Sequence, residues 1–487
     1  MTNISLKNLT FAYPGQAPLF ENANFELDTT WRLGLLGRNG RGKTTLFNIL
    51  QNKLSYTGQL NLPVALGYFP QPIADKQQLA LYCLAETGTF ETWELKRELK
   101  LFGLSEDLLW RPFETLSGGE QTKLMLCALF CQIDRFLLLD EPTNHLDQAG
   151  RQELCDYLNQ KKQGFIVTSH DRNFLNQLID HTLVIEKTQI ILEKGDFSSY
   201  EQQKKRRDQT DQGQNEKTRH ELHRLKQAAL VKENWANQAE KQKQNNAHTD
   251  KGFIGHRAAK VMKRKTALSK RAQEQLRKKE QQLANLETRE ALRLNYQPTH
   301  RQLLVQAKNF SLAYEKELFS QLNFDINAHE IVVVKGKNGS GKSSILQALL
   351  DKSTATKNGK LTLNTPNFSV IDQDFTTETG TLKEFAQKRQ LDYTLLLTLL
   401  KKLGLERHSF STRIEHMSLG QQKKVQLAAS LATPAELYLW DEPLNYLDID
   451  NQDQLIELLH HVHPAMLIIE HDQNFIDQIA DKVIELA

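Results

Sequence analysis

The feature that most constrains the fold of this 487-residue chain is an internal repeat. The pattern G-x-x-x-x-G-K-[ST] occurs twice, with its lysine at Lys43 and at Lys342, and each copy is followed by a serine-glycine motif, an Asp-Glu pair and a histidine. From the serine to the aspartate there are 23 residues in both copies, and from the aspartate to the histidine 30 in both. These equal spacings predict two homologous domains, at residues 1–200 and 301–487, joined by a linker at residues 201–300.

Each lysine motif has the sequence context of a phosphate-binding loop. In the first copy the strand-like run Trp31 to Leu36 precedes the loop, and apolar residues at helical spacing follow it from Leu46. Glycines let backbone N–H groups wrap phosphates at a helix N-terminus, the lysine reaches the terminal phosphates, and the next hydroxyl can ligate Mg²⁺. A chance glycine-rich turn would explain one motif, but not the features that follow it. The candidate phosphate-binding residues are Gly37, Asn39, Gly40, Gly42, Lys43, Thr44, Thr45, Gly336, Asn338, Gly339, Gly341, Lys342, Ser343 and Ser344.

The Asp-Glu pair follows a short apolar run, Phe136 to Leu139, which is typical of a buried parallel strand. At the end of such a strand Asp140 can hold Mg²⁺, usually through water, and Glu141 can polarise an attacking water molecule. The second copy repeats the pair. We therefore expect ATP and Mg²⁺ as cofactors, with Thr44, Asp140, Ser343 and Asp441 as metal ligands and with Glu141 and Glu442 as catalytic groups.

The run Leu116 to Gln121 reads LSGGEQ and resembles the signature sequence of ATP-binding-cassette (ABC) ATPases. In this resemblance Tyr13 stands where an aromatic ring stacks on adenine, Gln71 stands in the Q-loop, and His170 is the switch histidine. Taken singly, these could be a strand aromatic, a surface amide and a core or helix-capping histidine, but their joint order excludes coincidence. The resemblance implies nucleotide-binding roles for Tyr13, Gln71, Ser117, Gly118, Gly119, Tyr314, Gln373, Ser418, Gly420 and Gln421, and catalytic roles for His170 and His471.

ABC cassettes work as head-to-tail sandwiches, in which each ATP lies between the phosphate loop of one copy and the signature of the other. The resemblance therefore implies two composite sites within one chain, and we expect both to bind and hydrolyse ATP, at rates that need not be equal. The implied fold is α/β: two P-loop NTPase domains, each a doubly wound sheet with a helical subdomain, joined by an antiparallel helical hairpin. The second copy departs from the family pattern at Leu419, Leu444 and Glu470, the first of which bears on the clamp of the first site.

The linker differs from the rest of the chain in charge. Residues 201–300 contain 24 Lys+Arg against 12 Asp+Glu, whereas the whole chain contains 62 against 59, so the linker is net +12 and the remainder net −9. Its Lys, Arg, Gln, Glu and Ala content favours helices. Apolar stripes at 222–236 and 272–286 predict a hairpin with its tip at about residues 246–264. A basic helical arm suits a polyanionic partner.

The predicted tip concentrates basic residues. From Lys251 to Arg271 there are eight Lys and Arg residues and no Asp or Glu. Such residues at helical spacing can contact successive phosphates, and apolar or aromatic side chains between them can stack on unpaired bases. The alternative is a solvated basic hairpin whose apolar residues only pack the two helices. The candidate contact residues are Phe253, Ile254, Arg257, Lys260, Val261, Met262, Lys263 and Arg264.

Two cassettes with a charged helical linker of about 100 residues, and the sequence DEPTNHLD at 140–147, resemble the ABC-F proteins over essentially the whole chain. The stretches 255–264 and 296–300 are similar to the linker of the Lsa and Vga group of resistance factors. The resemblance implies a ribosome-bound ATPase that occupies the tRNA exit site, contacts large-subunit ribosomal RNA and a peptidyl-site tRNA, and protects the peptidyl-transferase centre against lincosamides, pleuromutilins and streptogramin A.

Composition narrows the remaining alternatives. The chain has 39% hydrophobic and 25% charged residues, no apolar run long enough to span a bilayer and no signal peptide, so we expect a cytoplasmic protein. Because both cassettes lie in one chain, we also expect a monomer that closes its own sandwich. The four cysteines form no C-x-x-C pair, so reduced structural thiols are expected. A general translation factor without a drug role stays open, and so does an energising subunit of a membrane transporter, although the latter leaves the basic linker unexplained.

Overall fold

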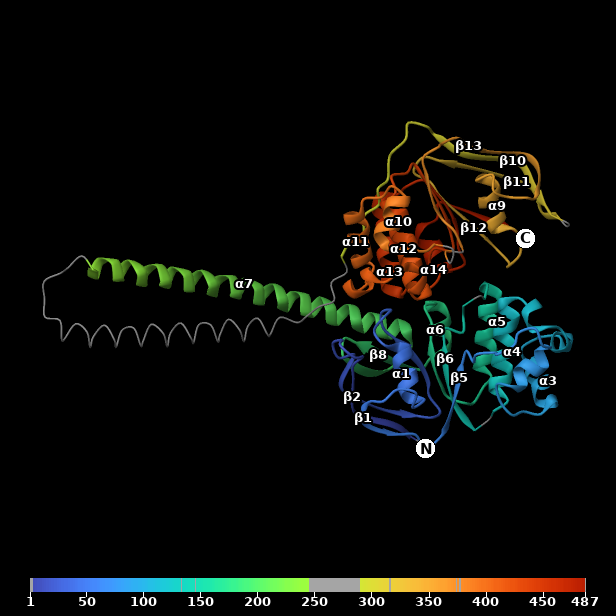
Figure 1. Cartoon of the computed structure of the whole chain (residues 1–487), viewed down its shortest axis with the longest axis horizontal. Coiled ribbons are helices and arrows are strands. Elements are labelled where there is room, and N and C mark those ends of the chain that lie inside the picture. Colours follow the sequence, from blue (N-terminus) through green and yellow to red (C-terminus); the bar gives the residue numbers. More distant parts are fainter. Residues whose placement is uncertain are drawn as a thin grey trace. The chain divides into compact units, whose positions relative to one another are not determined.

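The computed structural model describes residues 3–132, 134–144, 146–244, 290–314, 317–373, 375 and 378–486. The chain separates into two compact units, one formed by Met1–Ser198 with Arg289–Ala487 and the other by Ser199–Thr288. The first unit contains both copies of the repeat, which Figure 1 colours blue to green and yellow to red. The predicted domain boundaries at residues 200 and 300 stay predictions.

The first copy is built on two sheets. A six-stranded sheet has the order β5-β6-β7-β3-β8-β9, in which only the β8–β9 pair is antiparallel, and a three-stranded antiparallel sheet has the order β2-β1-β4. In the larger sheet β6 pairs with β7 so that Asp140 lies opposite Thr168. The strands are β1 (Asn3–Phe11), β2 (Phe20–Asp28), β3 (Arg32–Leu36), β4 (Thr57–Asn61), β5 (Ala65–Phe69), β6 (Arg135–Asp140), β7 (Phe165–Thr168), β8 (His181–Glu186) and β9 (Gln189–Lys194).

The second copy repeats this arrangement. Its parallel sheet has the order β14-β15-β16-β12-β17, and its antiparallel sheet has the order β11-β10-β13. The pairing of β15 with β16 brings Asp441 opposite Ile469, the position that Thr168 holds in the first copy. The strands are β10 (Leu303–Ala313), β11 (Glu317–Asn327), β12 (Ile331–Gly336), β13 (Thr356–Leu363), β14 (Phe368–Ile371), β15 (Leu437–Asp441), β16 (Met466–Ile469) and β17 (Lys482–Leu486).

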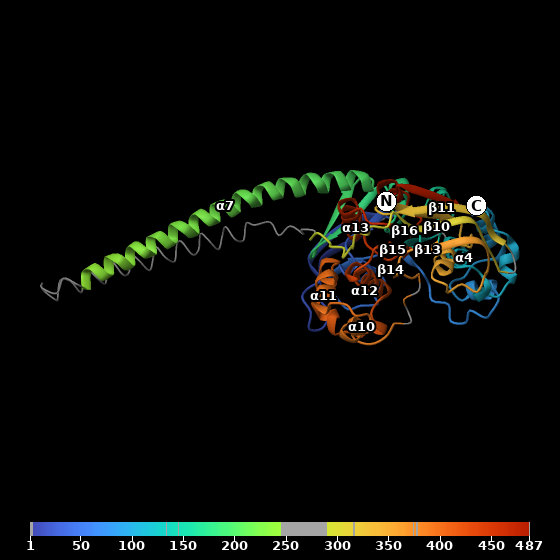
Figure 2. The same cartoon turned by 90° about the horizontal axis from the view of Figure 1, so that it is seen from above.

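Helices complete each copy and fall into two groups. One group follows the strands of the parallel sheet: α1 (Lys43–Leu50), α5 (Gln148–Asn159) and α6 (Arg172–Leu178), and in the second copy α9 (Lys342–Leu349), α13 (Ile449–Val462) and α14 (Gln473–Ile479). The other group forms the predicted helical subdomains: α2 (Ala80–Ala85), α3 (Thr92–Leu101) and α4 (Gly118–Phe130), and α10 (Leu382–Lys388), α11 (Tyr393–Lys402) and α12 (Leu419–Ala432). Figure 2 shows α10, α11 and α12 gathered away from β10, β11 and β13.

Buried apolar side chains explain why these elements assemble. In the first copy one core joins both sheets through α1, whose Leu46, Phe47 and Ile49 are fully buried between them. The strands of the parallel sheet are apolar on both faces, because helices or the second sheet cover each face. The prediction of two ABC-type α/β domains is confirmed by this architecture.

The first part of the linker lies in α7 (Phe197–Gln244), a helix of 48 residues that starts shortly before residue 201, as the helix-favouring composition of the linker predicts. At 1.5 Å per residue this helix is about 72 Å long. The predicted returning helix and the tip at 246–264, with all the tip residues named above, lie outside the described residues and stay predictions. No helix in the described ranges is both long and apolar enough to cross a bilayer.

Candidate nucleotide sites

The first phosphate loop places its lysine at the start of α1. Gly42 precedes that helix with φ +96°, a left-handed conformation that favours glycine, and a Cβ there would lie 2.6 Å from a methyl carbon of Leu19. The Lys43 ammonium donates to the carbonyl oxygen of Gly37 at 2.8 Å and to Oδ1 of Asn39 at 3.2 Å. Gly42 is therefore required by both conformation and space, and Lys43 is held where a phosphate would meet the loop.

Asp140 is surrounded by hydroxyl donors. It accepts hydrogen bonds from Thr44 Oγ1 at 3.0 Å, from Tyr68 Oη at 3.2 Å and from Thr168 Oγ1 at 2.7 Å. Thr168 also accepts from the backbone N–H of Glu141 at 2.8 Å, so one hydroxyl ties the two acidic residues together. Thr44 and Asp140 thus lie together as a hydroxyl and a carboxylate, the oxygen donors that suit Mg²⁺. The sequence did not suggest Tyr68 and Thr168. The only indication in the sequence is that each is a polar residue in an apolar strand, Tyr68 within β5 and Thr168 at the end of β7.

Glu141 and His170 form a partly buried pair beside this aspartate. His170 Nε2 lies 3.1 Å from Glu141 Oε1, and the carboxylate is held by a backbone with φ +50° at Glu141. Burial raises the pKa of Glu141 to about 7, and the ammonium of Lys43 acts in the opposite direction. Burial, reinforced by Lys43, lowers the pKa of His170 to about 3, so its ring is neutral at physiological pH. A neutral imidazole and a carboxylate at this distance can together orient a water molecule.

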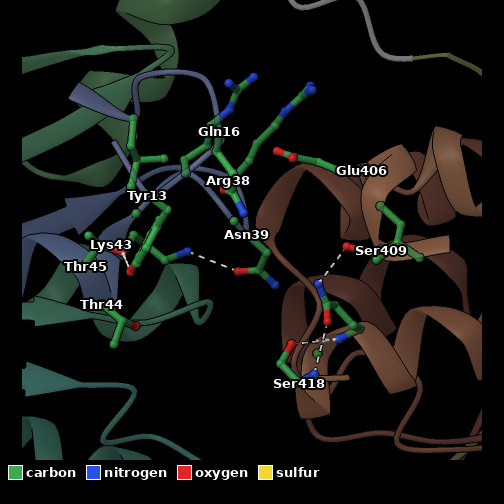
Figure 3. Close-up of a pocket in the computed structure, with 18 of the residues that line it drawn as sticks. Tyr13, Gln16, Arg38, Asn39, Lys43, Thr44, Thr45, Glu406, Ser409 and Ser418 are labelled. Atoms are coloured by element: carbon green, nitrogen blue, oxygen red, sulfur yellow. Dashed lines mark hydrogen bonds between the residues drawn. The ribbon is translucent and has the colours of Figure 1, made fainter. Parts of the chain in front are cut away.

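A cavity of about 990 Å³ joins the first phosphate loop to the signature of the second copy. Figure 3 shows Tyr13, Lys43 and Thr44 on one wall, and Ser409 and Ser418 on the other. The Tyr13 hydroxyl is hydrogen-bonded to Thr45 Oγ1 at 3.0 Å. The structure thus brings together the residues that a head-to-tail site requires. Its predicted members among the lining residues are Tyr13, Asn39, Gly40, Gly42, Lys43, Thr44, Thr45, Asp140, Glu141, His170, Ser418, Gly420 and Gln421.

The same cavity has lining residues that the sequence did not suggest. Glu406 and Ser409 follow α11, Ser409 within the 3₁₀ helix Arg407–Ser411, and both face the first phosphate loop. Lys424 lies one turn beyond the signature on α12. Leu419 is the first residue of α12 and is 53% exposed, while its neighbour Gly420 lines the cavity. Ser418 and Gly420 line the cavity and Leu419 does not, so the leucine at the usual glycine position does not narrow the cavity.

Direct hydrogen bonds connect the two copies next to this cavity. The backbone N–H of Asn39 donates to Asp448 Oδ2 at 2.9 Å, and the Asn39 side-chain amide donates to the carbonyl oxygen of Tyr446 at 2.9 Å. Reciprocally, the backbone N–H of Asn338 donates to Asp147 Oδ2 at 3.3 Å. Each phosphate loop is therefore held by an aspartate that follows the Asp-Glu pair of the other copy, across more than 190 residues of sequence in both cases.

The lysine of the second phosphate loop is more deeply buried than the lysine of the first. Lys342 is buried and donates to the carbonyl oxygens of Gly336 at 2.9 Å and Lys337 at 2.7 Å. Burial raises the pKa of Asp441 to about 6, and a hydrogen bond from Ser343 opposes this rise. Oδ1 of Asp441 is buried without a hydrogen-bond partner in the described part of the chain. A buried, unpartnered carboxylate oxygen next to a hydroxyl is a donor set that fits Mg²⁺.

The catalytic candidates of the second copy lie around Glu442. Its Oε2 accepts from Gln373 Nε2 at 3.3 Å and from Asn445 Nδ2 at 2.5 Å, and its Oε1 lies 3.7 Å from His471 Nε2. Burial lowers the pKa of His471 to about 4, so this imidazole is also neutral. The predicted Q-loop glutamine thus contacts the predicted catalytic carboxylate directly.

The other predicted residues have individual positions. Ser117 caps α4 by accepting from the backbone N–H of Glu120, and Gly118 and Gly119 begin that helix. Gln71 lines a narrow crevice with Tyr68 and Thr87. Tyr314 is 47% exposed. The remaining phosphate-loop candidates Gly339, Gly341 and Ser344 lie at or next to the N-terminus of α9, where Gly341 has φ +92°.

Comparisons with known proteins agree with this geometry. The model of the family described as ABC transporter matches residues 20–144 and 319–445. The ribosome protection protein VmlR of Bacillus subtilis (strain 168) is 28% identical over 99% of this chain and 86% of that protein. The erythromycin resistance ATP-binding protein MsrA of Staphylococcus epidermidis is 26% identical over 93% of this chain and 92% of that protein. The archaeal ribosome recycling factor aABCE1 has a similar fold, with a TM-score of 0.61 at 19% identity, over 98% of this chain and 87% of that one.

Proposed function

We propose a ribosomal role for this chain, which belongs to the ABC transporter family and is an ATP-binding protein of its ABC-F group. Its two ABC domains make it an ATPase, and its relatives include ribosome protection and resistance proteins. The finer proposal is that it enters the tRNA exit site as a monomer in the cytoplasm, contacts ribosomal RNA with its linker, and protects the peptidyl-transferase centre from lincosamides, pleuromutilins and streptogramin A, as the Lsa and Vga group does.

The composite cavity is the observation that carries the proposal. Its walls come from the phosphate loop of one copy and the signature region of the other, so ATP bound there contacts both copies at once. The linker starts after the first copy and ends before the second. Because nucleotide binding sets the spacing of the two copies, it also sets the spacing of the two ends of the linker. ATP thereby controls the geometry in which a net +12 arm is presented to a polyanion.

The residues of the first site have distinct roles in hydrolysis. Mg²⁺, when bound, would neutralise phosphate charge, and the residues that would hold it are Thr44 and Asp140, with Ser343 and Asp441 in the second site. Lys43 and the loop N–H groups bind the phosphates. Glu141 orients the attacking water and receives its proton, and neutral His170 keeps the carboxylate in place at 3.1 Å. In this proposal hydrolysis opens the sandwich and releases the factor, and the drug is never a substrate.

Ribosome co-sedimentation tests the proposal. The Glu141→Gln/Glu442→Gln variant should pellet with ribosomes in the presence of ATP and stay in the supernatant with ADP, because it binds ATP but cannot leave the closed state. Adding Lys43→Ala and Lys342→Ala gives a matched control that should not pellet with ATP. If the first variant stays in the supernatant at low salt, where phosphate contacts are strongest, the ribosomal role is wrong and a transporter subunit must be reconsidered.

The drug role needs its own experiment. Expression in a susceptible bacterium should raise the inhibitory concentrations of lincosamides, pleuromutilins and streptogramin A. Deletion of residues 246–264 should abolish this increase. It should leave the ATPase activity unchanged, because the ATP sites lie in the other unit of the chain. Unchanged drug tolerance, together with a growth defect when the gene is deleted from its own host, would instead favour a general translation factor.

A further inference from the structure

The two nucleotide sites differ in how their acidic residues are supported. From Asp140 and Asp441 to the two histidines, residues of the second copy correspond to those of the first at a constant offset of 301. In the first copy a set of hydroxyls lies behind the site. Thr168 joins Asp140 to the backbone of Glu141, and Thr143 Oγ1 and Ser169 Oγ share a buried hydrogen bond of 2.9 Å.

The second copy has none of these hydroxyls at the matched positions. Ile469 replaces Thr168, Leu444 replaces Thr143, and Glu470 replaces Ser169. All three replacements are buried. At the matched position on the signature helix, Lys423 stands where the first copy has Thr122. A set of neutral hydroxyls in the first site has therefore been exchanged for apolar side chains, one carboxylate and one ammonium.

The Lys423 ammonium reaches the ends of two neighbouring strands. It lies 3.4 Å from the carbonyl oxygen of Asp372, just after β14, and 3.4 Å from the carbonyl oxygen of Asp441, the last residue of β15. Gln426, one turn further along α12, donates to the same Asp372 carbonyl at 2.8 Å. The next residue after Asp372 is Gln373, whose amide contacts Glu442 at 3.3 Å. The lysine thus bridges the Q-loop and the catalytic strand.

Lys423 and Glu470 are both almost fully buried, at 6% and 4% exposure. Burial lowers the pKa of Lys423, and the carboxylates of Asp441 and Glu470 act in the opposite direction. Burial raises the pKa of Glu470, and Lys423 is among the groups that oppose the rise. A buried charge is tolerated only with compensation, which Lys423 receives from the two carbonyl oxygens that it contacts and from the nearby acidic side chains.

We propose that Lys423 is a positioning residue of the second nucleotide site. Its ammonium holds the main chain at Asp372 and Asp441 together and so sets the distance between Gln373 and Glu442. It also places a positive charge behind Asp441, whose Oδ1 has no hydrogen-bond partner among the described residues, whereas Asp140 accepts a hydrogen bond from Thr168. The first site achieves the same support with neutral hydroxyls. Hydrolysis at the second site therefore depends on this buried ammonium, and hydrolysis at the first does not.

The test measures each site separately. Glu141→Gln leaves hydrolysis to the second site, and Glu442→Gln leaves it to the first. In the Glu141→Gln background, Lys423→Met should lower kcat by about 10-fold with little change in the KM for ATP, as loss of a supporting residue around metal and catalytic ligands commonly does. Lys423→Arg, which keeps the charge and the donors, should recover most of this loss. In the Glu442→Gln background, Lys423→Met should change kcat by less than about 2-fold.

Hydrogen exchange supplies a readout that needs no turnover. In Lys423→Met the peptide covering residues 365–373 should exchange about 10-fold faster, and in Lys423→Arg at nearly the original rate. Converting both positions to the first-copy residues, Lys423→Thr/Glu470→Ser, should slow this exchange relative to Lys423→Thr alone, because the second change removes a buried acidic side chain that Lys423 helps to accommodate. Equal kcat losses in both backgrounds, or unchanged exchange in Lys423→Met, would overturn the proposal. Neither result depends on the ribosomal role.

Discussion

A buried charged cluster in the helical subdomain of the first copy allows a quantitative prediction. Glu98 on α3 accepts a hydrogen bond of 2.7 Å from the Tyr157 hydroxyl and an ion pair from Lys161, and it is only 2% exposed. The Lys161 ammonium also lies 4.3 Å from the centre of the Tyr157 ring. The cluster ties the helical subdomain to the end of α5. The matched residues of the second copy are apolar: Leu399, Leu458 and Val462.

Lys161→Met should remove the ammonium and leave the Glu98 carboxylate buried. Breaking a buried ion pair by removing one partner costs about 3–5 kcal/mol. Tyr157 and the half-exposed Arg97, at 3.2 Å from Glu98, still stabilise the carboxylate, so we expect about 3 kcal/mol, the lower end of that range. The triple variant Glu98→Leu/Tyr157→Phe/Lys161→Met removes every polar member together and should come within about 1 kcal/mol of the original stability, because well-packed apolar groups can replace a buried ionic cluster.

Hydrogen exchange of the α3 and α5 peptides measures this locally, which avoids assuming that a two-domain chain unfolds in one step. A loss of about 3 kcal/mol corresponds to exchange about 100-fold faster. The matched control is Lys96→Met, which breaks the exposed Lys96–Glu106 pair of 2.7 Å and should cost less than about 1 kcal/mol. Exchange in Lys161→Met that is as slow as in the control would contradict a large contribution from this ion pair, and so would a triple variant as unstable as the single one.

Three further predictions concern the nucleotide sites. Burial lowers the folded-state pKa of His170 and His471 to about 3 and about 4, so below pH 6.5 only the unfolded chain takes up these protons. Each histidine should therefore destabilise the nucleotide-free protein by about 2 kcal/mol at pH 5 relative to pH 8, opposite in sign to Glu141, whose pKa is raised to about 7. The change in stability between pH 8 and pH 5 should be less unfavourable in His170→Gln/His471→Gln, by about 2 kcal/mol per histidine in unfolding experiments, and equal changes in the two proteins would contradict this. Gly42→Ala should weaken ATP binding at the first site more than Gly40→Ala in equilibrium titrations, because both have positive φ but only the methyl at position 42 meets neighbouring atoms; equal losses would contradict this. Asp448→Ala removes the carboxylate that accepts a hydrogen bond from the backbone N–H of Asn39 in the first phosphate loop. A charge-assisted hydrogen bond contributes about 1.5 kcal/mol, so ATP binding at the first site should weaken about 10-fold in a fluorescent-nucleotide titration. Unchanged affinity would show that Asp448 does not support the loop.

The elements and many of their local features could be predicted from the sequence because they depend on residues close together in the chain. Phe136 to Leu139 is apolar without interruption, so it forms a strand buried on both faces and delivers Asp140 and Glu141 to its end. Gly42 and Lys43 lie at a strand-to-helix turn, where glycine freedom and the helix N-terminus are local properties. The equal spacings of the two copies then predict that each such element occurs twice.

The contacts that complete each site were decided by the tertiary structure. The hydrogen bond from Asn39 to Asp448 joins residues 409 positions apart, and the pairing of β6 with β7 brings Thr168 to Asp140 from 28 positions away. No periodicity encodes such contacts, because they depend on which strands pair and on how the two copies meet. The exchange of hydroxyls for Lys423 and Glu470 is visible in the sequence, but only packing shows that they occupy one buried region. Local sequence therefore specifies which groups can act on a nucleotide. What surrounds those groups depends on the tertiary structure, since burial and long-range hydrogen bonds arise only when distant segments pack.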